Sequence, residues 1–383
     1  MKEYAIVFAG GGTKGSYQVG VIKALKELGI KISAVAGSSI GTINGALFAS
    51  GEDQKLEKLY KNIKMQDILA LRERNKIDPN ENLFNPKNLF KIIEEVLATK
   101  GISNEPLKEL LKENLDLNKL YSSKIDFGFI TFDVEKKKGV ELYKEDIPKD
   151  KMIDYILASS CFPIFKPQSI NEKKYLDGGI FDNMPISLLV KKGYKDIILI
   201  DINGIGRIRR NIYKDVNFKI IKPVDSLGGT FNFNPNKIED NIKLGYLDTM
   251  KAFHKYLGFN YYFTNTEYYK LLNHFTLYEA YALEDVALYY EIDKLKKYNY
   301  KTFVKEILIR YEKDLEEYKR IKKDITNIKN IKELIEKKLV FPLMEDLINN
   351  YPTLFSSYKG IFKKYINASD SLRILYTENN YKI

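Results

Sequence analysis

The sequence is nearly free of the residues that most often bind metals or form disulfides. Among its 383 residues there are one cysteine, Cys161, and two histidines, His254 and His274. A single cysteine excludes a disulfide within the chain, and these three residues leave no cysteine–histidine cluster for zinc. We therefore expect no metal site, and the scarcity of cysteine is typical of a reducing compartment.

Long apolar segments are also absent. Nowhere do about 18 consecutive apolar residues occur, which is the length that a transmembrane helix needs. The first apolar run, Tyr4–Ala9, follows Glu3, is too short for the core of a signal peptide and continues into glycines. The sequence thus predicts a cytoplasmic or peripheral membrane protein, with no signal peptide or transmembrane segment.

Positive charge exceeds negative charge. There are 62 lysines and arginines against 51 aspartates and glutamates, which gives a formal net charge of +11. Such a chain would be attracted to an anionic membrane surface or to nucleic acid. The same lysines can simply form a solvated surface, and this is the more general explanation. Charge therefore allows peripheral membrane contact without requiring it. We expect no nucleic-acid partner, and the oligomeric state stays undefined.

The order of predicted elements indicates an α/β domain. Tyr4–Ala9 is strand-like and is followed by helical spacing, and further strands are predicted at Ile125–Phe132 and Asp196–Ile202. Alternating strands and helices are typical of an α/β layer. Between Gly51 and Ser123 this strand pattern is missing, so residues 51–123 are interpreted as a helical insertion.

The remainder of the chain is expected to be mostly helical. From about residue 236 long charged segments dominate, and Phe303, Ile307 and Tyr311 recur at the spacing of a helix face. No Pro/Ser-rich linker marks where the first domain ends. We place the boundary at residue 257, which gives domains 1–257 and 258–383.

A serine lies in a pattern that can expose a nucleophile. Ser39 is the centre of the pentad Gly37-Ser38-Ser39-Ile40-Gly41, between an apolar run and a stretch of small helical residues. In this context a sharp turn from strand to helix pushes the serine Oγ outward, and the flanking glycines, Gly37 and Gly41, avoid steric collision. The pentad alone is a weak signal, because glycine and serine are common in loops.

A glycine-rich loop precedes this serine. The hexapeptide is Gly10-Gly11-Gly12-Thr13-Lys14-Gly15, directly after the first strand. The free N–H groups at the start of the next helix can bind an anion, which in an acyl hydrolase is the tetrahedral oxyanion. Lys14 would add charge or orient the loop. The loop also fits a dinucleotide-binding fingerprint, but the acidic ribose anchor expected about 20 residues later is replaced by the Ser39 turn.

An aspartate is the candidate base. Neither histidine lies in a loop motif, and each is interpreted as a structural or surface residue. Asp177 begins the turn Asp177-Gly178-Gly179 after a short predicted strand, where a carboxylate could face Ser39. Taken alone, the segment could be an ordinary Asp-Gly turn.

Together these three motifs, in this order, resemble the signatures of the patatin-like phospholipase family. Supporting matches are Ala158–Pro163, Asn183 and Pro185, and the resemblance covers about residues 3–250. It implies a three-layer α/β/α fold with a mainly parallel sheet and hydrolysis of lipid acyl esters without metal or cofactor. It also implies a Ser39–Asp177 dyad and an oxyanion hole made by the glycine loop and Ile40. Lys14 and Gly179 stand where members often have arginine and alanine.

Two alternatives to a phospholipase or lysophospholipase stay open. One is a non-catalytic lipid-binding module on the same fold, and the other is a dinucleotide-binding protein. In the hydrolase, the apolar residues of the insertion could form a lid or an acyl groove, or merely cover a core: Ile68, Leu69, Leu71, Leu83, Phe84, Leu89 and Phe90. Tyrosine-rich C-terminal segments suit a lipid interface, although core packing is the more general explanation: Tyr261–Phe263, Tyr268–Lys270 and Tyr289–Tyr290.

Overall fold

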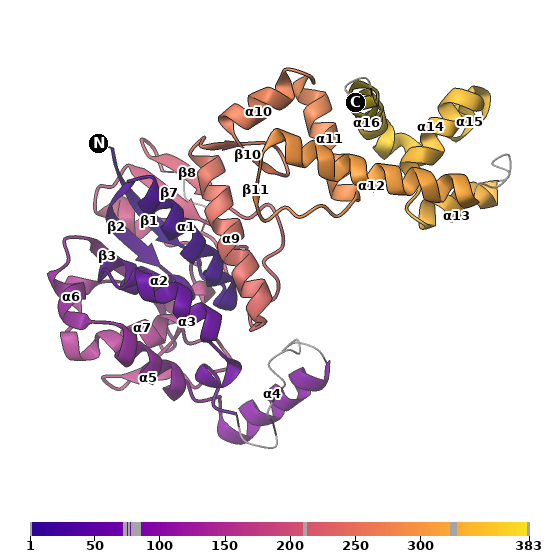
Figure 1. Ribbon diagram of the computed structural model, residues 1–383. Coiled ribbons are helices and arrows are strands. Elements are labelled where there is room, and N and C mark those ends of the chain that lie inside the picture. The colour runs from indigo at the N-terminus through magenta and orange to yellow at the C-terminus, as the bar shows by residue number, and fades with distance from the viewer. Residues whose placement is uncertain are drawn as a thin grey trace. The chain divides into compact units, whose positions relative to one another are not determined.

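The chain forms two compact units, Met1–Ala252 and Phe253–Ile383 (Figure 1). The computed structural model describes residues 2–71, 75, 77, 86–209, 213–321 and 328–380. Residues 256 and 257 form a strand that pairs within the second unit. The second unit therefore begins a few residues before the boundary that the sequence predicts at 257.

A mainly parallel sheet forms the centre of the first unit. Five strands run parallel in the order β3-β2-β1-β7-β8, and β4, β5 and β6 add antiparallel pairings at the β3 side. Residues 5–8 of β1 are completely buried, as expected for a central strand covered on both faces. The strands are β1 Glu3–Phe8, β2 Lys31–Gly37, β3 Asp126–Asp133, β4 Lys138–Tyr143, β5 Gln168–Ile170, β6 Lys173–Asp177, β7 Asp196–Ile200 and β8 Asn217–Ile221.

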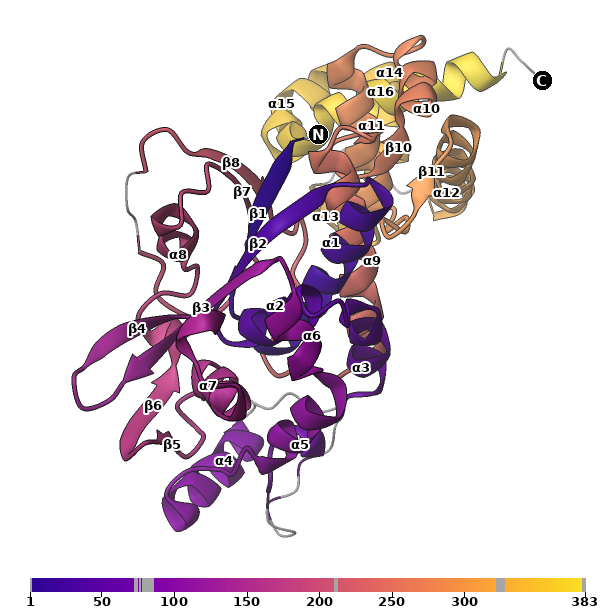
Figure 2. The same ribbon diagram turned by 90° about the vertical axis from the view of Figure 1, so that its left-hand side faces the viewer.

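Helices cover both faces of this sheet, which confirms the predicted three-layer α/β/α arrangement. Figure 2 shows α1, α2 and α9 on one face and α8 on the other. The helices of the first unit are α1 Ser16–Glu27, α2 Ile40–Ala49, α3 Leu56–Asn62, α4 Pro86–Thr99, α5 Glu105–Asn114, α6 Leu117–Ser122, α7 Met152–Ser159, α8 Ile186–Lys191 and α9 Pro235–Ala252. None of the helices in the described ranges is both long and apolar enough to cross a bilayer.

The first helix is held tightly by the last helix of this unit. Gly20 of α1 lies so close to α9 that a Cβ atom there would be 1.9 Å from the carbonyl oxygen of Ile242. The Tyr17 hydroxyl donates a hydrogen bond of 2.8 Å to Asp248 Oδ2 of α9. Because the glycine-rich loop leads directly into α1, this packing also fixes the loop.

The insertion shares a small hydrophobic core with the α/β domain. Met65, Leu69 and Ile92 are buried with Phe165 and Phe231 of the main domain, so the insertion is packed against the α/β layers. Two other predicted residues, Ile68 and Leu71, lie partly buried against this cluster. Phe90 does not join it, because its side chain is 68% exposed. Leu83, Phe84 and the Leu89 side chain lie outside the described residues.

The lone cysteine belongs to the same core. Cys161 is fully buried, and its Sγ lies 3.1 Å from the carbonyl oxygen of Lys166. Burial raises the pKa of the thiol to about 12. The thiolate form is therefore scarce near neutral pH, and a structural role fits this residue.

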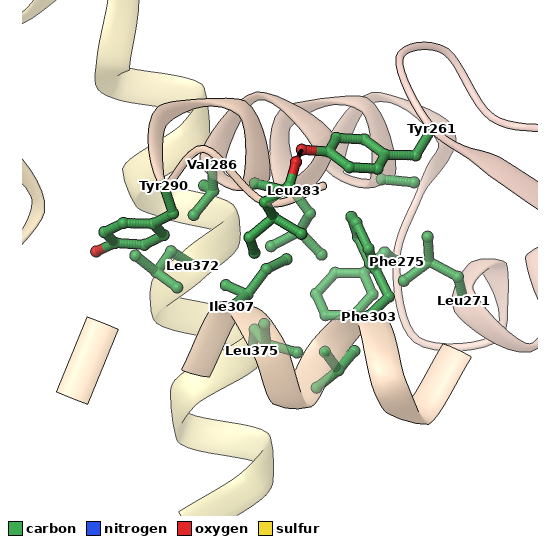
Figure 3. Close-up of a cluster of buried hydrophobic side chains, with 14 of the residues drawn as sticks. Tyr261, Leu271, Phe275, Leu283, Val286, Tyr290, Phe303, Ile307, Leu372 and Leu375 are labelled. Atoms are coloured by element: carbon green, nitrogen blue, oxygen red, sulfur yellow. Dashed lines mark hydrogen bonds between the residues drawn. The ribbon is translucent and has the colours of Figure 1, made fainter. Parts of the chain in front are cut away.

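The second unit is mostly helical. Its helices are α10 Asn265–Leu272, α11 Leu277–Tyr289, α12 Tyr300–Ile321, α13 Ile328–Glu336, α14 Val340–Asn350, α15 Pro352–Phe362 and α16 Ile366–Asn380. Three short strands complete it: β9 Tyr256–Leu257, β10 Tyr262–Thr264 and β11 Lys297–Tyr298. Its core joins aromatic rings and aliphatic side chains from α10, α11, α12 and α16 (Figure 3).

Most of the tyrosines that suggested a lipid interface lie in this core. Tyr261, Tyr262 and Phe263 are completely buried, and Tyr268 is 3% exposed. The alternative of core packing therefore holds for these residues. Tyr269 is the exception, at 59% exposed.

Candidate active site

Ser39 lies in a strained turn between β2 and α2. Its backbone has φ 54° and ψ −128°, a combination that residues other than glycine rarely adopt. A Cβ atom at Gly41 would lie 2.1 Å from the carbonyl oxygen of Phe8, so only glycine fits there. The turn therefore has the backbone geometry expected for a nucleophile turn. Contacts with neighbouring residues must stabilise this strained conformation.

Two serines at the end of α7 supply these contacts. Ser160 Oγ donates a hydrogen bond of 3.0 Å to the carbonyl oxygen of Ser39. Ser159 Oγ donates to the carbonyl oxygen of Ile130 at 2.7 Å and, having one proton, accepts from Thr42 Oγ1 at 2.7 Å. The Ala158–Pro163 segment therefore stabilises the turn through hydrogen bonds. The sequence predicted the segment as a family motif but did not predict these hydrogen bonds.

Asp177 lies at the end of β6 with its carboxyl group buried. One oxygen, Oδ1, accepts a hydrogen bond of 2.8 Å from the N–H of Gly179. Burial raises the pKa of Asp177 to about 6, against the opposing effects of the Ser39 hydroxyl and the Gly179 N–H. A carboxyl group with this pKa is mostly ionised at neutral pH and can still accept a proton.

The second carboxyl oxygen of Asp177 is left open. Oδ2 is buried and makes no well-formed hydrogen bond with any described residue. The Ser39 hydroxyl favours the carboxylate form of Asp177, although Oδ2 accepts no well-formed hydrogen bond from it. Catalytic hydrogen bonds are often loose until substrate is bound. An unpaired acceptor beside a serine hydroxyl is the arrangement that a general base needs.

The glycine loop offers fewer free donors than the sequence allows. The N–H of Gly10 donates to the carbonyl oxygen of Asn183 at 3.3 Å, and that of Thr13 donates to Thr230 at 2.8 Å. In contrast, the N–H groups of Gly11, Gly12 and Ile40 have no acceptor within the described part of the chain. These three residues line the pocket onto which Ser39 and Asp177 open.

Two predicted loop residues turn away from the site. Lys14 Nζ donates a hydrogen bond of 2.7 Å to the carbonyl oxygen of Asn203, and burial lowers the pKa of this lysine. Lys14 therefore orients the loop, which is one of its two predicted roles. Gly15 is packed against α2 and α3, where a Cβ atom would lie 2.3 Å from the Tyr60 hydroxyl oxygen. Neither residue lines the pocket, and Gly10 does not line it either.

A buried polar network behind the loop was not found from the sequence. Asn44 Nδ2 donates to Gln18 Oε1 at 2.7 Å and to the carbonyl oxygen of Gly15 at 3.1 Å. Gln18 in turn donates to the carbonyl oxygen of Ala9, and the Tyr60 hydroxyl donates to Asn44 Oδ1. The network joins α1, α2 and α3, so it fixes the loop from three elements.

Ser39 and Asp177 open onto one pocket of about 320 Å³, a size within the usual range for small-molecule sites. Gly11, Gly12, Thr13 and Ile40 lie along it, and Gly179 lies beside Asp177. Most of the remaining wall is apolar: Ile43, Tyr60, Ile63, Ile68, Leu107, Phe162, Pro163, Phe165, Ile180, Ile205, Phe231 and Phe233. Four of these residues come from the insertion, which therefore forms part of the pocket wall as well as a core.

Ionisable side chains are few in this pocket. Among the described residues that line it, Asp177 is the only carboxylate and Arg207 the only cation. Both histidines lie in the second unit, where His274 stacks on Tyr300 with ring centroids 5.5 Å apart. Among the described residues no group of three histidine, cysteine, aspartate or glutamate side chains could hold a metal ion.

Comparisons with known proteins indicate which family this chain resembles. The model of the family "Patatin-like phospholipase" matches residues 6–190. Lysophospholipase NTE1 of Cryptococcus neoformans is 25% identical over 220 residues, which are 56% of this chain but only 12% of that protein. A probable lipid hydrolase, 463L, of Invertebrate iridescent virus 6 is 25% identical over 250 residues, or 62% of this chain and 82% of that protein.

Among solved structures, VipD from Legionella pneumophila aligns with 98% of this chain and 88% of its own. The TM-score is 0.40 and the identity 16%, values too low to define a shared fold by themselves. The residues that the family model matches lie within the unit that holds the Ser39 turn. Residues 6–190 therefore match a patatin-like phospholipase domain.

Proposed function

We propose that the protein is a serine-dependent lipid acyl hydrolase of the phospholipase A or lysophospholipase type. Ser39 is the nucleophile and Asp177 its base. The observation that carries this proposal is the meeting of a strained serine turn, a buried carboxylate with one unpaired oxygen and unpaired N–H groups at a single apolar pocket. Each feature costs stability, and their combination fits a catalytic site better than a structural one.

In the first half of the reaction, Ser39 Oγ attacks the carbonyl carbon of the ester while its proton passes to Asp177. The oxyanion that forms accepts hydrogen bonds from the N–H groups of Gly11, Gly12 and Ile40. Collapse of this intermediate breaks the bond to the alcohol. Asp177 returns the proton to the leaving oxygen, and the fatty acyl group remains on Ser39.

In the second half, water takes the place of the alcohol. Asp177 accepts a proton from the water as its oxygen attacks the acyl carbonyl, and the fatty acid leaves when the proton returns to Ser39 Oγ. An alcohol that reached the acyl-enzyme before water would give transacylation by the same steps. The predominantly apolar wall is suited to an acyl chain rather than to a polar substituent.

A fluorophosphonate probe tests this proposal directly, because it reacts covalently with activated serines. We expect the full chain to be labelled at Ser39 and to hydrolyse a short nitrophenyl ester. Ser39→Ala should lose both properties. The matched control is Ser38→Ala, which removes the neighbouring buried hydroxyl and should keep labelling. Labelling that persists in Ser39→Ala would refute the assignment.

The same experiment separates the two alternatives. A non-catalytic lipid-binding module would bind lipid but show neither labelling nor ester hydrolysis. A dinucleotide-binding protein would bind a nicotinamide cofactor, and lipid esters would be left intact. Analysis of the products released from lipid mixtures would then define the acyl position and the headgroup.

A further inference from the structure

Helix α4 of the insertion, Pro86–Thr99, exposes an unusual amount of apolar surface. Phe90, Ile93 and Leu97 are 68%, 48% and 77% exposed. At 100° per residue these three positions lie on one side of the helix, so they form a continuous stripe. This set of three side chains is called the α4 stripe.

The opposite side of α4 is well buried. Asn88 is completely buried, Ile92 is 3% exposed and Glu95 is 1% exposed, with Glu95 Oε2 accepting a hydrogen bond from Asn75. The helix therefore has one buried face and one exposed face, and the α4 stripe belongs to the exposed face. An apolar face of this kind on a soluble surface is typical of an interaction site.

The buried face of α4 connects the stripe to the candidate active site. Ile92 packs in the cluster that contains Phe165, Phe231 and Phe233, and these three aromatic residues also line the pocket. The buried face of α4 and the pocket wall thus share one hydrophobic cluster. A surface that received the stripe would lie close to the site where the proposed ester substrate binds.

Charge indicates which surface this is. Lys87 and Lys100 are exposed and lie three residues before Phe90 and three residues after Leu97. An apolar stripe with lysines at its ends is the pattern of a helix that lies in the plane of an anionic membrane. The net charge of +11 favours the same partner.

We propose that α4 docks the protein on an anionic lipid surface, with the α4 stripe inserted among the acyl chains and Lys87 and Lys100 against the headgroups. The inference rests on the proposed function, because the docked surface supplies the ester to the neighbouring pocket. It moves the lipid contact from the C-terminal tyrosines, most of which are buried, to the insertion.

Co-sedimentation of the full chain with vesicles of phosphatidylcholine and phosphatidylserine tests this contact. We expect Phe90→Asp and Leu97→Asp each to reduce the bound fraction at least about tenfold, since each replaces a large inserted side chain by a charge. Both variants should keep full activity on a soluble nitrophenyl ester while losing hydrolysis of vesicle lipid. The matched control is Ile220→Asp, at an apolar side chain of β8 that is 57% exposed.

The proposal would be overturned if the wild-type chain did not bind these vesicles, or if Phe90→Asp and Leu97→Asp bound as well as wild type. Equal losses in Ile220→Asp would also overturn it, because the effect would not be specific to α4. Failure of the hydrolase assignment gives a different result: vesicle binding would still depend on α4, but no ester would be cleaved. Circular dichroism confirms that the exposed substitutions leave the fold intact.

Discussion

Two buried carboxylates, one in each unit of the chain, are paired very differently. Glu284 of α11 is completely buried and accepts hydrogen bonds from three consecutive backbone N–H groups, those of Phe259, Asn260 and Tyr261. Asp177 is also buried, but it accepts one well-formed backbone hydrogen bond, and its Oδ2 is left without a partner among the described residues.

The difference separates a structural carboxylate from a reactive one. Glu284 fixes the loop before β10, because its carboxyl oxygens accept hydrogen bonds from three successive backbone N–H groups. Asp177 keeps part of its hydrogen-bonding capacity unused and has a pKa raised to about 6 by burial. Burial alone therefore does not identify a functional acid. A buried carboxylate that lies beside a serine and has an oxygen without a hydrogen-bond donor is the better indication.

The largest expected effect is on catalysis in the first unit. Asp177→Asn keeps the size and one acceptor oxygen of the side chain but cannot take a proton from Ser39. We expect kcat/KM on a soluble nitrophenyl ester to fall about 10⁴-fold, as for other members of catalytic dyads and triads. Steady-state kinetics with purified protein measures this. Activity within tenfold of wild type would remove Asp177 from the mechanism.

A smaller loss is expected at the glycine loop. Gly12 has φ 60°, and a Cβ atom there would lie 2.1 Å from the carbonyl oxygen of Thr230. Gly12→Ala should displace the loop and its free N–H groups and lower kcat about 10²- to 10³-fold. Gly229→Ala is the control, because a Cβ atom at Gly229 meets nothing within 4 Å. Equal kcat values for the two variants would argue against an oxyanion hole in this loop.

In the second unit the expected effect is on stability. Glu284→Ala leaves three backbone N–H groups, of which that of Tyr261 is buried, without their acceptor and should lower the free energy of unfolding by about 4 kcal/mol. Asp285→Ala, at the exposed neighbouring residue, should change it by less than about 1 kcal/mol. Chemical denaturation monitored by circular dichroism compares them. Similar free energies of unfolding for the two variants would show that Glu284 does not stabilise this loop.

The Asp177 substitution has the opposite effect on stability. Its pKa rises from 3.8 in the unfolded chain to about 6 in the folded protein, so this group destabilises the fold as pH rises through that interval. Asparagine carries no such penalty. Asp177→Asn should therefore be more stable than wild type at pH 7, by up to about 3 kcal/mol, and about equally stable below pH 4.

Denaturation of both proteins at pH 4 and pH 7 checks this prediction. A variant that is less stable than wild type at pH 7 would show that the carboxylate is needed structurally, as Glu284 is. The comparison between the two carboxylates would then fail.

Local motifs of the sequence predicted much of the site. Three short glycine-containing motifs hold Ser39, the glycine loop and Asp177. Because glycine determines the backbone geometry of each motif, residues adjacent in the chain were enough to predict these positions. The three-layer fold and the family are confirmed. The dyad and the donors of the oxyanion hole stay predictions, since they concern reactivity.

Contacts between distant residues could not be predicted in this way. The network of Gln18, Asn44 and Tyr60 joins three helices, and nothing in the spacing of these residues announces it. The sequence also did not predict which of these apolar side chains are buried. Tyr261 lies in a core and Phe90 is exposed, although each belongs to a short aromatic or apolar segment flanked by polar residues. Tertiary packing, rather than local composition, decides such cases.

The most direct test of the account is the pH dependence of fluorophosphonate labelling at Ser39, followed by mass spectrometry. If Asp177 is the base, the labelling rate should rise as pH passes through about 6 and then level off. In Asp177→Asn labelling should be slow and show no such rise. A wild-type rate that does not change between pH 4 and pH 8, or a rise that persists in Asp177→Asn, would contradict the Ser39–Asp177 dyad.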